Sequence, residues 1–192
     1  MLKILIVNNA EPGIKDFTKP VEKIIADAGA DSFCIEYHEC ISFNFNEFDG
    51  IILSGSPQGN DIVEHHSRYF NWIKTFKKPV LGICAGHHII GFLFGSQIIR
   101  SVEPESGDFE VEIVKQDPIV EGLSTNFRVK QMHNDSITLP EKFELLATSK
   151  TCKVQLMKHN HYPLYSSQFH PEFYNIRLIQ NFTRHCNNKP KA

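Results

Sequence analysis

The stretch PVLGICAGHHIIGFLFG, at residues 79–95, constrains the fold of this chain more than any other. A short apolar run, Val80–Ile83, leads directly into Cys84, and a helix-like segment, Gly86–Phe94, follows it. Gly82 and Gly86 flank the cysteine in the pattern G-x-C-x-G, and small residues are what a sharp strand-to-helix turn requires. The pattern favours a nucleophilic cysteine on such a turn; the alternative is a buried structural cysteine, which is common.

Strand-like and helix-like segments alternate along the first half of the chain. Predicted strands are Lys3–Val7, Phe33–Tyr37, Gly50–Leu53 and Val80–Ile83, and predicted helices are residues 15–28, Glu64–Phe76 and Gly86–Phe94. This alternation predicts a parallel sheet that is covered by helices on both faces.

The rhythm changes after Gln97, where short strand-like runs follow one another without long helices. These runs are Phe109–Val114, Phe127–Gln131, Glu144–Thr148, Val154–Met157 and Leu164–Phe169, with a closing helix predicted at Ile176–Cys186. We therefore expect one α/β domain over residues 1–186, with a mostly parallel central sheet flanked by helices and a strand-rich C-terminal half. Residues 187–192 are expected to form a disordered tail.

Composition excludes several classes of function. The chain has 20 Lys and Arg against 22 Asp and Glu, a net charge of −2, so no basic surface for nucleic acid is expected. Its 5 cysteines are scattered without a CxxC pattern, which predicts neither a disulfide framework nor a zinc site. MLKILIVNN predicts a first buried strand, and no apolar run approaches the roughly 20 residues of a membrane span. We expect a cytoplasmic protein with no membrane contact.

A nucleophilic cysteine needs a base and a group that orients the base. Among the 10 histidines, His170 has the most suitable setting, because SSQFHPEF places it at the end of a predicted strand. Pro171 ends that strand, and the carboxylate of Glu172 two residues on can hold the imidazole in one orientation. The alternative is a loop with an incidental charge, which the elbow makes much less favourable.

The third requirement is a pair of hydrogen-bond donors for an oxyanion. The turn-rich segment LSGSPQGN follows the strand GIIL, so it is expected at the carboxyl edge of the parallel sheet, near the elbow. The backbone N–H groups of Ser56 and of Ala85, which follows the nucleophile, are suitable donors.

Together these residues resemble the class I (triad) glutamine amidotransferases, and among them the glutaminase domain of GMP synthase. ILSGSP stands at the family's Gly-Gly-Pro loop, VLGICAGHHII at its nucleophile elbow and SSQFHPEF at its His-x-Glu pair. The segment MHNDSITLPEKFELLATSKTCKV is similar to the part of that domain between the last two motifs. Nearly the whole chain is covered, and the elbow and the histidine are 170 − 84 = 86 residues apart, a specific combination.

The resemblance implies a flavodoxin-like α/β fold and a glutaminase that uses no cofactor and no metal. Cys84 would form a glutamyl thioester, His170 would act as base and acid, and Glu172 would orient His170. Residues implied near the substrate are Gly55, His88, His133 and Asn134. The released ammonia would pass to a separate ATP-dependent synthetase chain, because the sequence has no GxxxxGK[ST] phosphate loop of its own.

Two positions depart from the family pattern and keep other interpretations open. Ser56 stands where the family has glycine, and His88 stands where the elbow has a glutamine that helps form the substrate pocket. The alternatives are a stand-alone hydrolase of γ-glutamyl or other amide or peptide substrates, or a non-catalytic regulatory module. Metal binding by the pairs His65-His66 and His87-His88 is disfavoured, because adjacent helical residues point about 100° apart.

Overall fold

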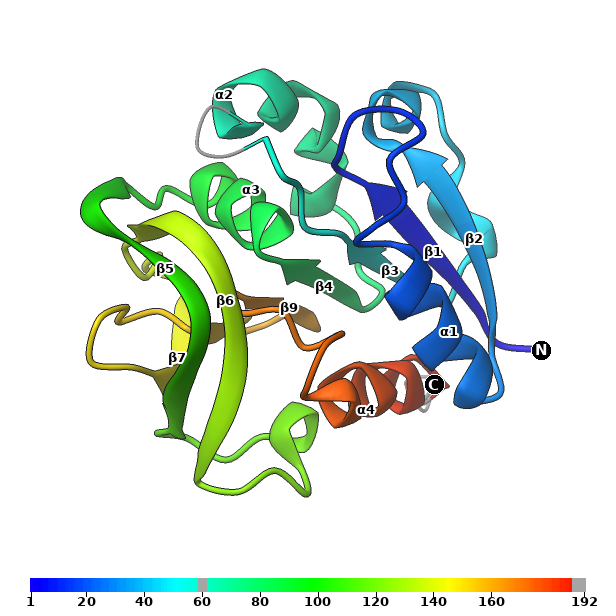
Figure 1. Ribbon diagram of the computed structural model, residues 1–192. Helices are drawn as coiled ribbons and strands as arrows, with labels where there is room; N and C mark the ends of the chain where they lie inside the picture. The colour runs from blue at the N-terminus through cyan, green and yellow to red at the C-terminus, as the bar shows by residue number, and fades with distance from the viewer. Residues whose placement is uncertain (59–61, 188–192) are drawn as a thin grey trace.

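A single nine-stranded sheet forms the centre of the computed structural model, which describes residues 1–58 and 62–187, with the side chains of 101–103 left out (Figure 1). The strands are β1 (Lys3–Asn8), β2 (Asp31–Glu36), β3 (Gly50–Leu53), β4 (Val80–Ile83), β5 (Ile98–Ile113), β6 (Asn126–Ile137), β7 (Phe143–Thr148), β8 (Leu156–His159) and β9 (Leu164–Ser167). The helices are α1 (Lys19–Asp27), α2 (Ile62–His66), α3 (Ala85–Leu93) and α4 (Ile176–Asn187). Among these described helices, none is long and apolar enough to cross a membrane.

The sheet order, β2-β1-β3-β4-β9-β8-β7-β5-β6, joins a parallel half to an antiparallel half. β2, β1, β3, β4 and β9 are parallel neighbours, whereas β8, β7, β5 and β6 continue the sheet in antiparallel pairs. The expected α/β domain is therefore confirmed, and its strand-rich half is the antiparallel part of the same mixed sheet. β9, although it comes last, lies beside β4 in the middle of the sheet.

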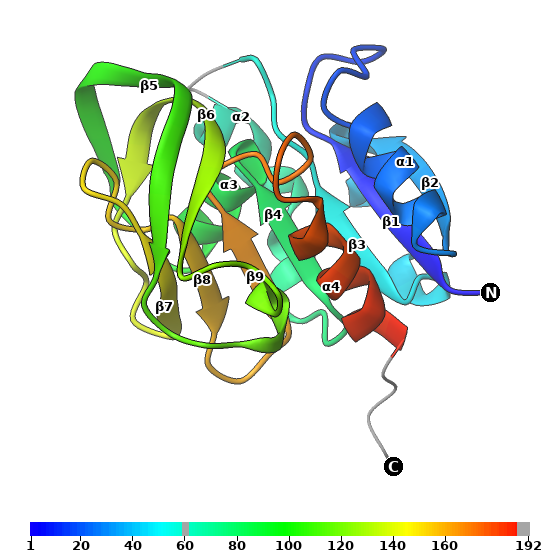
Figure 2. The same ribbon diagram turned by 60° about the horizontal axis from the view of Figure 1, so that its bottom comes forward.

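The inner parallel strands β1, β3 and β4 are buried on both faces, as their apolar sequences predict, whereas β2 is the partly exposed edge strand. Alternate residues of β1 point to opposite sides, so that Ile4 and Ile6 pack in the cluster that contains the buried residues of α1 and α4. Leu5 and Val7 pack on the other side, with Ile89 of α3. Figure 2 shows α1 and α4 together on one side of the sheet, while the long β5–β6 ribbon stands apart from them.

The structure differs from the sequence prediction chiefly in two segments. The helix predicted at Glu64–Phe76 is instead the short α2, followed by 3₁₀ turns at Ser67–Tyr69 and Asn71–Lys74. Phe70 and Ile73 are buried although the long helix is absent. The aromatic residues of this segment have only modest helix propensity, which favours short turns over one helix. β5 and β6 are much longer than predicted, and they pair with each other over most of their length, with an irregularity between Arg100 and Glu105. Asn187 ends α4, and the rest of the expected tail lies outside the described residues.

Two glycines allow β4 and α3 to pack closely around the turn between them. A Cβ atom on Gly82 would lie 2.6 Å from the backbone carbonyl carbon and oxygen of Gly86. A Cβ on Gly86 would lie 2.7 Å from the carbonyl oxygen and from the Cβ of Leu53 on β3. Because backbone atoms at these contacts have little room to move, both positions require glycine.

We expect Gly82→Ala to lower the free energy of unfolding by about 2–3 kcal/mol, through overpacking at this turn. Urea denaturation measures the change. Gly29→Ala is the matched control, because no atom lies within 4 Å of the added Cβ and only the strain of its φ of +79° is introduced. A Gly82→Ala protein as stable as wild type would contradict the packing argument.

Candidate active site

Cys84 occupies a strained turn between β4 and α3. Its φ and ψ are 49° and −96°, and it is the one non-glycine residue with positive φ among those that the structure describes. Two hydrogen bonds hold the turn: the Cys84 N–H donates to the carbonyl of Ser167 at 2.8 Å, and the His88 N–H donates to the carbonyl of Cys84 at 3.1 Å. Strain of this kind concentrates at functional sites and persists because the surrounding structure imposes it.

His170 and Glu172 form a buried pair just beyond β9. The Nδ1 atom of His170 lies 2.8 Å from Oε1 of Glu172, and the side chains are 1% and 0% exposed. The ring of Phe17 lies over the imidazole at a centroid distance of 5.3 Å. A Cβ on Gly55 would lie 2.8 Å from Cε1 of His170, so this glycine leaves space for the histidine.

The electrostatic surroundings favour an imidazolium at His170. Burial by itself would lower its pKa, but Cys84 and the carboxylate of Glu172 act in the opposite direction and raise the pKa to about 10. The Nε2 atom has no hydrogen-bond partner of normal geometry among the described residues. This nitrogen is thus available to exchange a proton with a group close to Cys84, and such contacts are often long before substrate binds.

A cavity of about 290 Å³ opens beside the thiol, a size that suits a small molecule. Its lining includes six residues that the sequence had singled out, Ser56, Cys84, Ala85, His88, His133 and Asn134. Gly55, His170 and Glu172 are buried outside this lining. Ser56 does not adopt a left-handed conformation, so this position does not require glycine.

His133 is poorly placed to act as the base, because both of its ring nitrogens face other groups. Its Nδ1 lies 2.9 Å from the carbonyl oxygen of Asp135, and its Nε2 lies 3.0 Å from Oε2 of Glu105. Burial alone would raise the pKa of Glu105, but hydrogen bonds from His133 and Thr151 lower it below the usual value. The cavity therefore has an ionised carboxylate in its wall.

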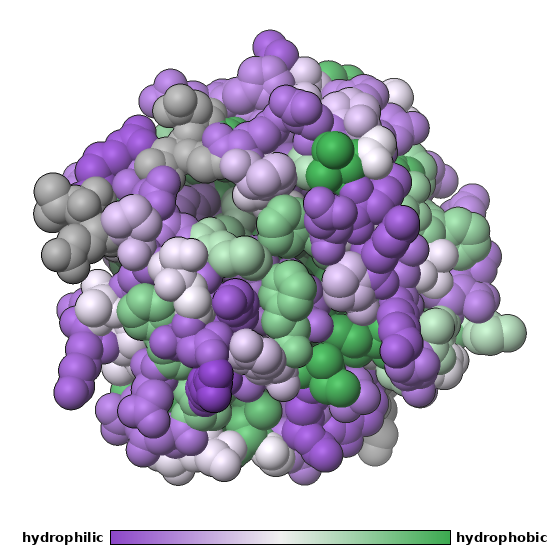
Figure 3. Space-filling model, in the orientation of Figure 1, coloured by the Kyte–Doolittle hydropathy of each residue, from purple (hydrophilic) through white to green (hydrophobic). Residues whose placement is uncertain are grey.

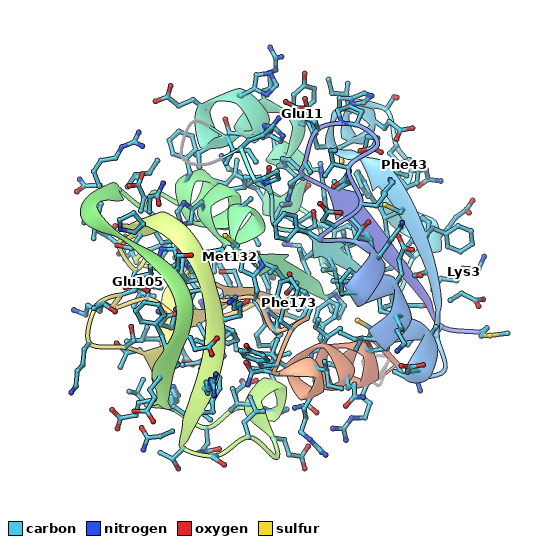
Figure 4. The ribbon with its side chains drawn as sticks, viewed as in Figure 1. Lys3, Glu11, Phe43, Glu105, Met132 and Phe173 are labelled. Carbon is cyan, nitrogen blue, oxygen red and sulfur yellow. The ribbon has the colours of Figure 1, made fainter. Side chains whose placement is uncertain are left out.

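Among the residues of the site that were not found from the sequence, Glu105, Met132 and Gln168 bear most on its chemistry. Glu105 and Met132 come from the adjacent strands β5 and β6, and both line the cavity (Figure 4). Gln168 is fully buried, and its side-chain nitrogen lies 3.9 Å from Sγ of Cys84. The signals for them were weak: Gln168 stands two residues before His170, Met132 stands next to His133, and Glu105 is one of 22 acidic residues.

No group of three or more His, Cys, Asp or Glu side chains that could hold a metal ion occurs in the described parts of the chain. The adjacent histidines have other contacts. His65 and His66 face each other with their Nδ1 atoms 3.1 Å apart, and Nδ1 of His87 pairs with the hydroxyl of Ser166 at 2.8 Å. His87 therefore links α3 to β9.

We expect His170 to keep its proton as the pH rises from about 6.5, the usual pKa of histidine, to about 10. In Cys84→Ala, only Glu172 opposes the effect of burial, so the pKa of His170 should fall well below that of the wild type. Nitrogen NMR titration of labelled histidines measures both proteins, with His170→Gln to assign the signal. An identical titration in the two proteins would show that Cys84 and His170 do not interact.

Comparison with known proteins identifies the family. Residues 14–185 match the family Glutamine amidotransferase class-I. The glutamine-hydrolysing GMP synthase subunit of Pyrococcus furiosus is 39% identical over 71% of this chain and 75% of that protein, and the protein of the same name from Thermoplasma acidophilum is 31% identical over 97% and 94%. The crystal structure of a GMP synthase subunit from T. acidophilum superposes with a TM-score of 0.87, at 30% identity, over 97% of this chain and 94% of the other. The chain belongs to the class I glutamine amidotransferase family.

Proposed function

We propose that this glutamine amidotransferase hydrolyses the side-chain amide of glutamine through a thioester on Cys84 and delivers the ammonia to a separate synthetase. One arrangement carries the proposal: Cys84 has a strained backbone at the N-terminus of α3, it raises the pKa of the buried His170, and a carboxylate lies 2.8 Å from that histidine. That combination provides a nucleophile, a proton carrier and an orienting group.

Acylation begins when the Cys84 sulfur attacks the amide carbon of the substrate. The carbonyl oxygen becomes an oxyanion, and the N–H groups of Ser56 and Ala85 are the proposed donors to it. Ala85 begins α3, so its N–H has no partner within the helix and lies at the positive end of the helix dipole. The C–N bond breaks as Nε2 of His170 gives its proton to the nitrogen, which leaves as ammonia.

Deacylation reverses the part played by His170. Its Nε2, now unprotonated, takes a proton from a water molecule whose oxygen attacks the thioester carbon. The C–S bond breaks, glutamate forms, and the sulfur and the imidazolium return to their starting states. Glu172 keeps Nδ1 protonated and the ring oriented throughout.

The charge in the cavity suits an amino acid substrate. Glutamine and γ-glutamyl amides both carry an α-ammonium group, and the ionised Glu105 in the cavity wall is of opposite sign. The cavity of about 290 Å³ also favours a free amino acid or its small derivatives over a folded protein substrate.

The partner is proposed from the relatives and from the surface of the chain. The relatives' shared name makes them one subunit of a GMP synthase, which supports a separate ATP-dependent synthetase chain as the acceptor of ammonia. Phe173, Tyr174 and Ile176 follow the His-Pro-Glu segment and are 44%, 49% and 43% exposed. Figure 3 shows apolar patches within the otherwise hydrophilic centre of this face, a surface suited to contact with another protein.

Cys84→Ala should reduce ammonia release from glutamine at least about 10³-fold, and Glu172→Gln roughly 10²- to 10⁴-fold. A coupled ammonia assay measures both, with and without a GMP synthetase chain, and Cys34→Ala is the control because that thiol lies outside the cavity. A glutamine-analogue diazo-ketone should label Cys84 alone among the 5 cysteines. Equal activity of wild type and Cys84→Ala, or labelling elsewhere, would exclude Cys84 as the nucleophile.

His88 makes the choice of amide a separate question, because it lines the cavity at the position where the family resemblance implies a glutamine. A panel of glutamine and γ-glutamyl amides, tested on wild type and His88→Gln, compares kcat/KM for each substrate. We expect glutamine to be preferred by both proteins. A wild-type preference for a γ-glutamyl amide that His88→Gln reverses would instead favour the stand-alone hydrolase.

A further inference from the structure

A chain of two side-chain contacts connects His88 to the sulfur of Cys84. Nε2 of His88 lies 2.7 Å from Oε1 of Gln168, and Nε2 of Gln168 lies 3.9 Å from Sγ of Cys84, within the range of a hydrogen bond to sulfur. His88 comes from α3 and is 6% exposed, and Gln168 follows β9 and is 0% exposed. The contacts thus bridge the two segments that supply Cys84 and His170.

The chemistry of the two groups fixes which atoms donate. An amide oxygen only accepts hydrogen bonds, so the His88 nitrogen that faces it at 2.7 Å must carry a hydrogen. Burial, the main influence, lowers the pKa of His88, so a neutral ring with its hydrogen on Nε2 meets this requirement. With the oxygen engaged, the NH₂ group of Gln168 is turned toward the sulfur.

The opposite amide orientation would be unfavourable for a nucleophile. Rotating the Gln168 amide by 180° would place its oxygen beside the sulfur and remove a donor from the thiolate. The sulfur also lies 3.8 Å from the carbonyl oxygen of Met132, which can accept a hydrogen bond from the thiol but cannot stabilise a thiolate. Gln168 is therefore the neutral donor that favours the reactive form of Cys84.

We propose that His88 is a positioning residue that acts through Gln168: its Nε2–H holds the amide in the orientation that donates a hydrogen bond to the Cys84 thiolate. On this view the ring nitrogen that relatives lack serves the nucleophile and does not contact the substrate. The catalytic consequence rests on the proposed function, but the hydrogen-bond chain itself can be measured without glutamine.

Alkylation of Cys84 by iodoacetamide, followed by peptide mass spectrometry, tests the chain of contacts directly. Gln168→Leu removes the donor, and His88→Phe keeps a ring but removes the N–H. Each should lower the alkylation rate at pH 7 about three- to tenfold and move the rate profile to higher pH, as loss of a hydrogen bond to a charged sulfur predicts. His88→Gln, which keeps an N–H donor, should restore most of the rate.

The double variant distinguishes action through Gln168 from an independent effect. His88→Phe combined with Gln168→Leu should alkylate at the same rate as Gln168→Leu alone. Multiplied losses in the double variant, or an unchanged profile in His88→Phe, would overturn the proposal. Other titratable or charged groups near His88 and Cys84 stay unaltered in all variants; they are His87, Arg100, His133, Asp135 and His170.

A second measurement uses the unaltered protein, so it does not depend on how the variants fold. The nitrogen NMR shifts of His88, assigned with His88→Gln, should show a neutral ring protonated at Nε2 near pH 7. A hydrogen on Nδ1, or an imidazolium, would overturn the proposal. Failure to release ammonia from glutamine would contradict the proposed function and leave both of these results unchanged.

Discussion

The rest of the site depends on one backbone constraint, the positive φ of Cys84 between β4 and α3. A conformation of this kind is unfavourable by about 1–3 kcal/mol for a residue with a side chain, so its surroundings must impose it. The close packing of β4 and α3 around the turn does so, and Gly82 and Gly86 make that packing possible. The same turn aims the thiol into the cavity and exposes the first N–H groups of α3 to it.

Because the polar groups of the site are buried, their electrostatic interactions are strong, and each group needs a partner to replace water. His170 and Glu172 are nearly inaccessible to water, and removing charged groups from water is unfavourable unless partners replace it. The two side chains that act on the sulfur each have a defined second contact: Glu172 for His170, and His88 for Gln168. Of these two groups, the imidazolium of His170 is charged and the amide of Gln168 is neutral.

The sequence predicts the nucleophile turn, the His-Pro-Glu segment and the parallel strands well, because each depends on residues that are neighbours in the chain. Gly50–Leu53 and Val80–Ile83 form strands with the predicted bounds. Of the long β5–β6 ribbon, only the segments near Phe109–Val114 and Phe127–Gln131 were predicted, since the rest of the ribbon lacks the alternation that marks a half-buried strand. For the same reason Glu105 and the link from His88 to Gln168 were missed: they are contacts between distant segments that no local pattern encodes.

The place of β9 in the sheet has a consequence for how the protein acquires its reactivity. β9 is the last strand in the chain, yet it inserts between β4 and β8, and the residues just after it supply Gln168 and His170. During synthesis Cys84 is made long before His170, its proposed base, and pairing strands so distant in sequence is a slow step of folding. An incomplete chain thus carries a cysteine without a proton acceptor, so reactivity arises only when the middle of the sheet is filled.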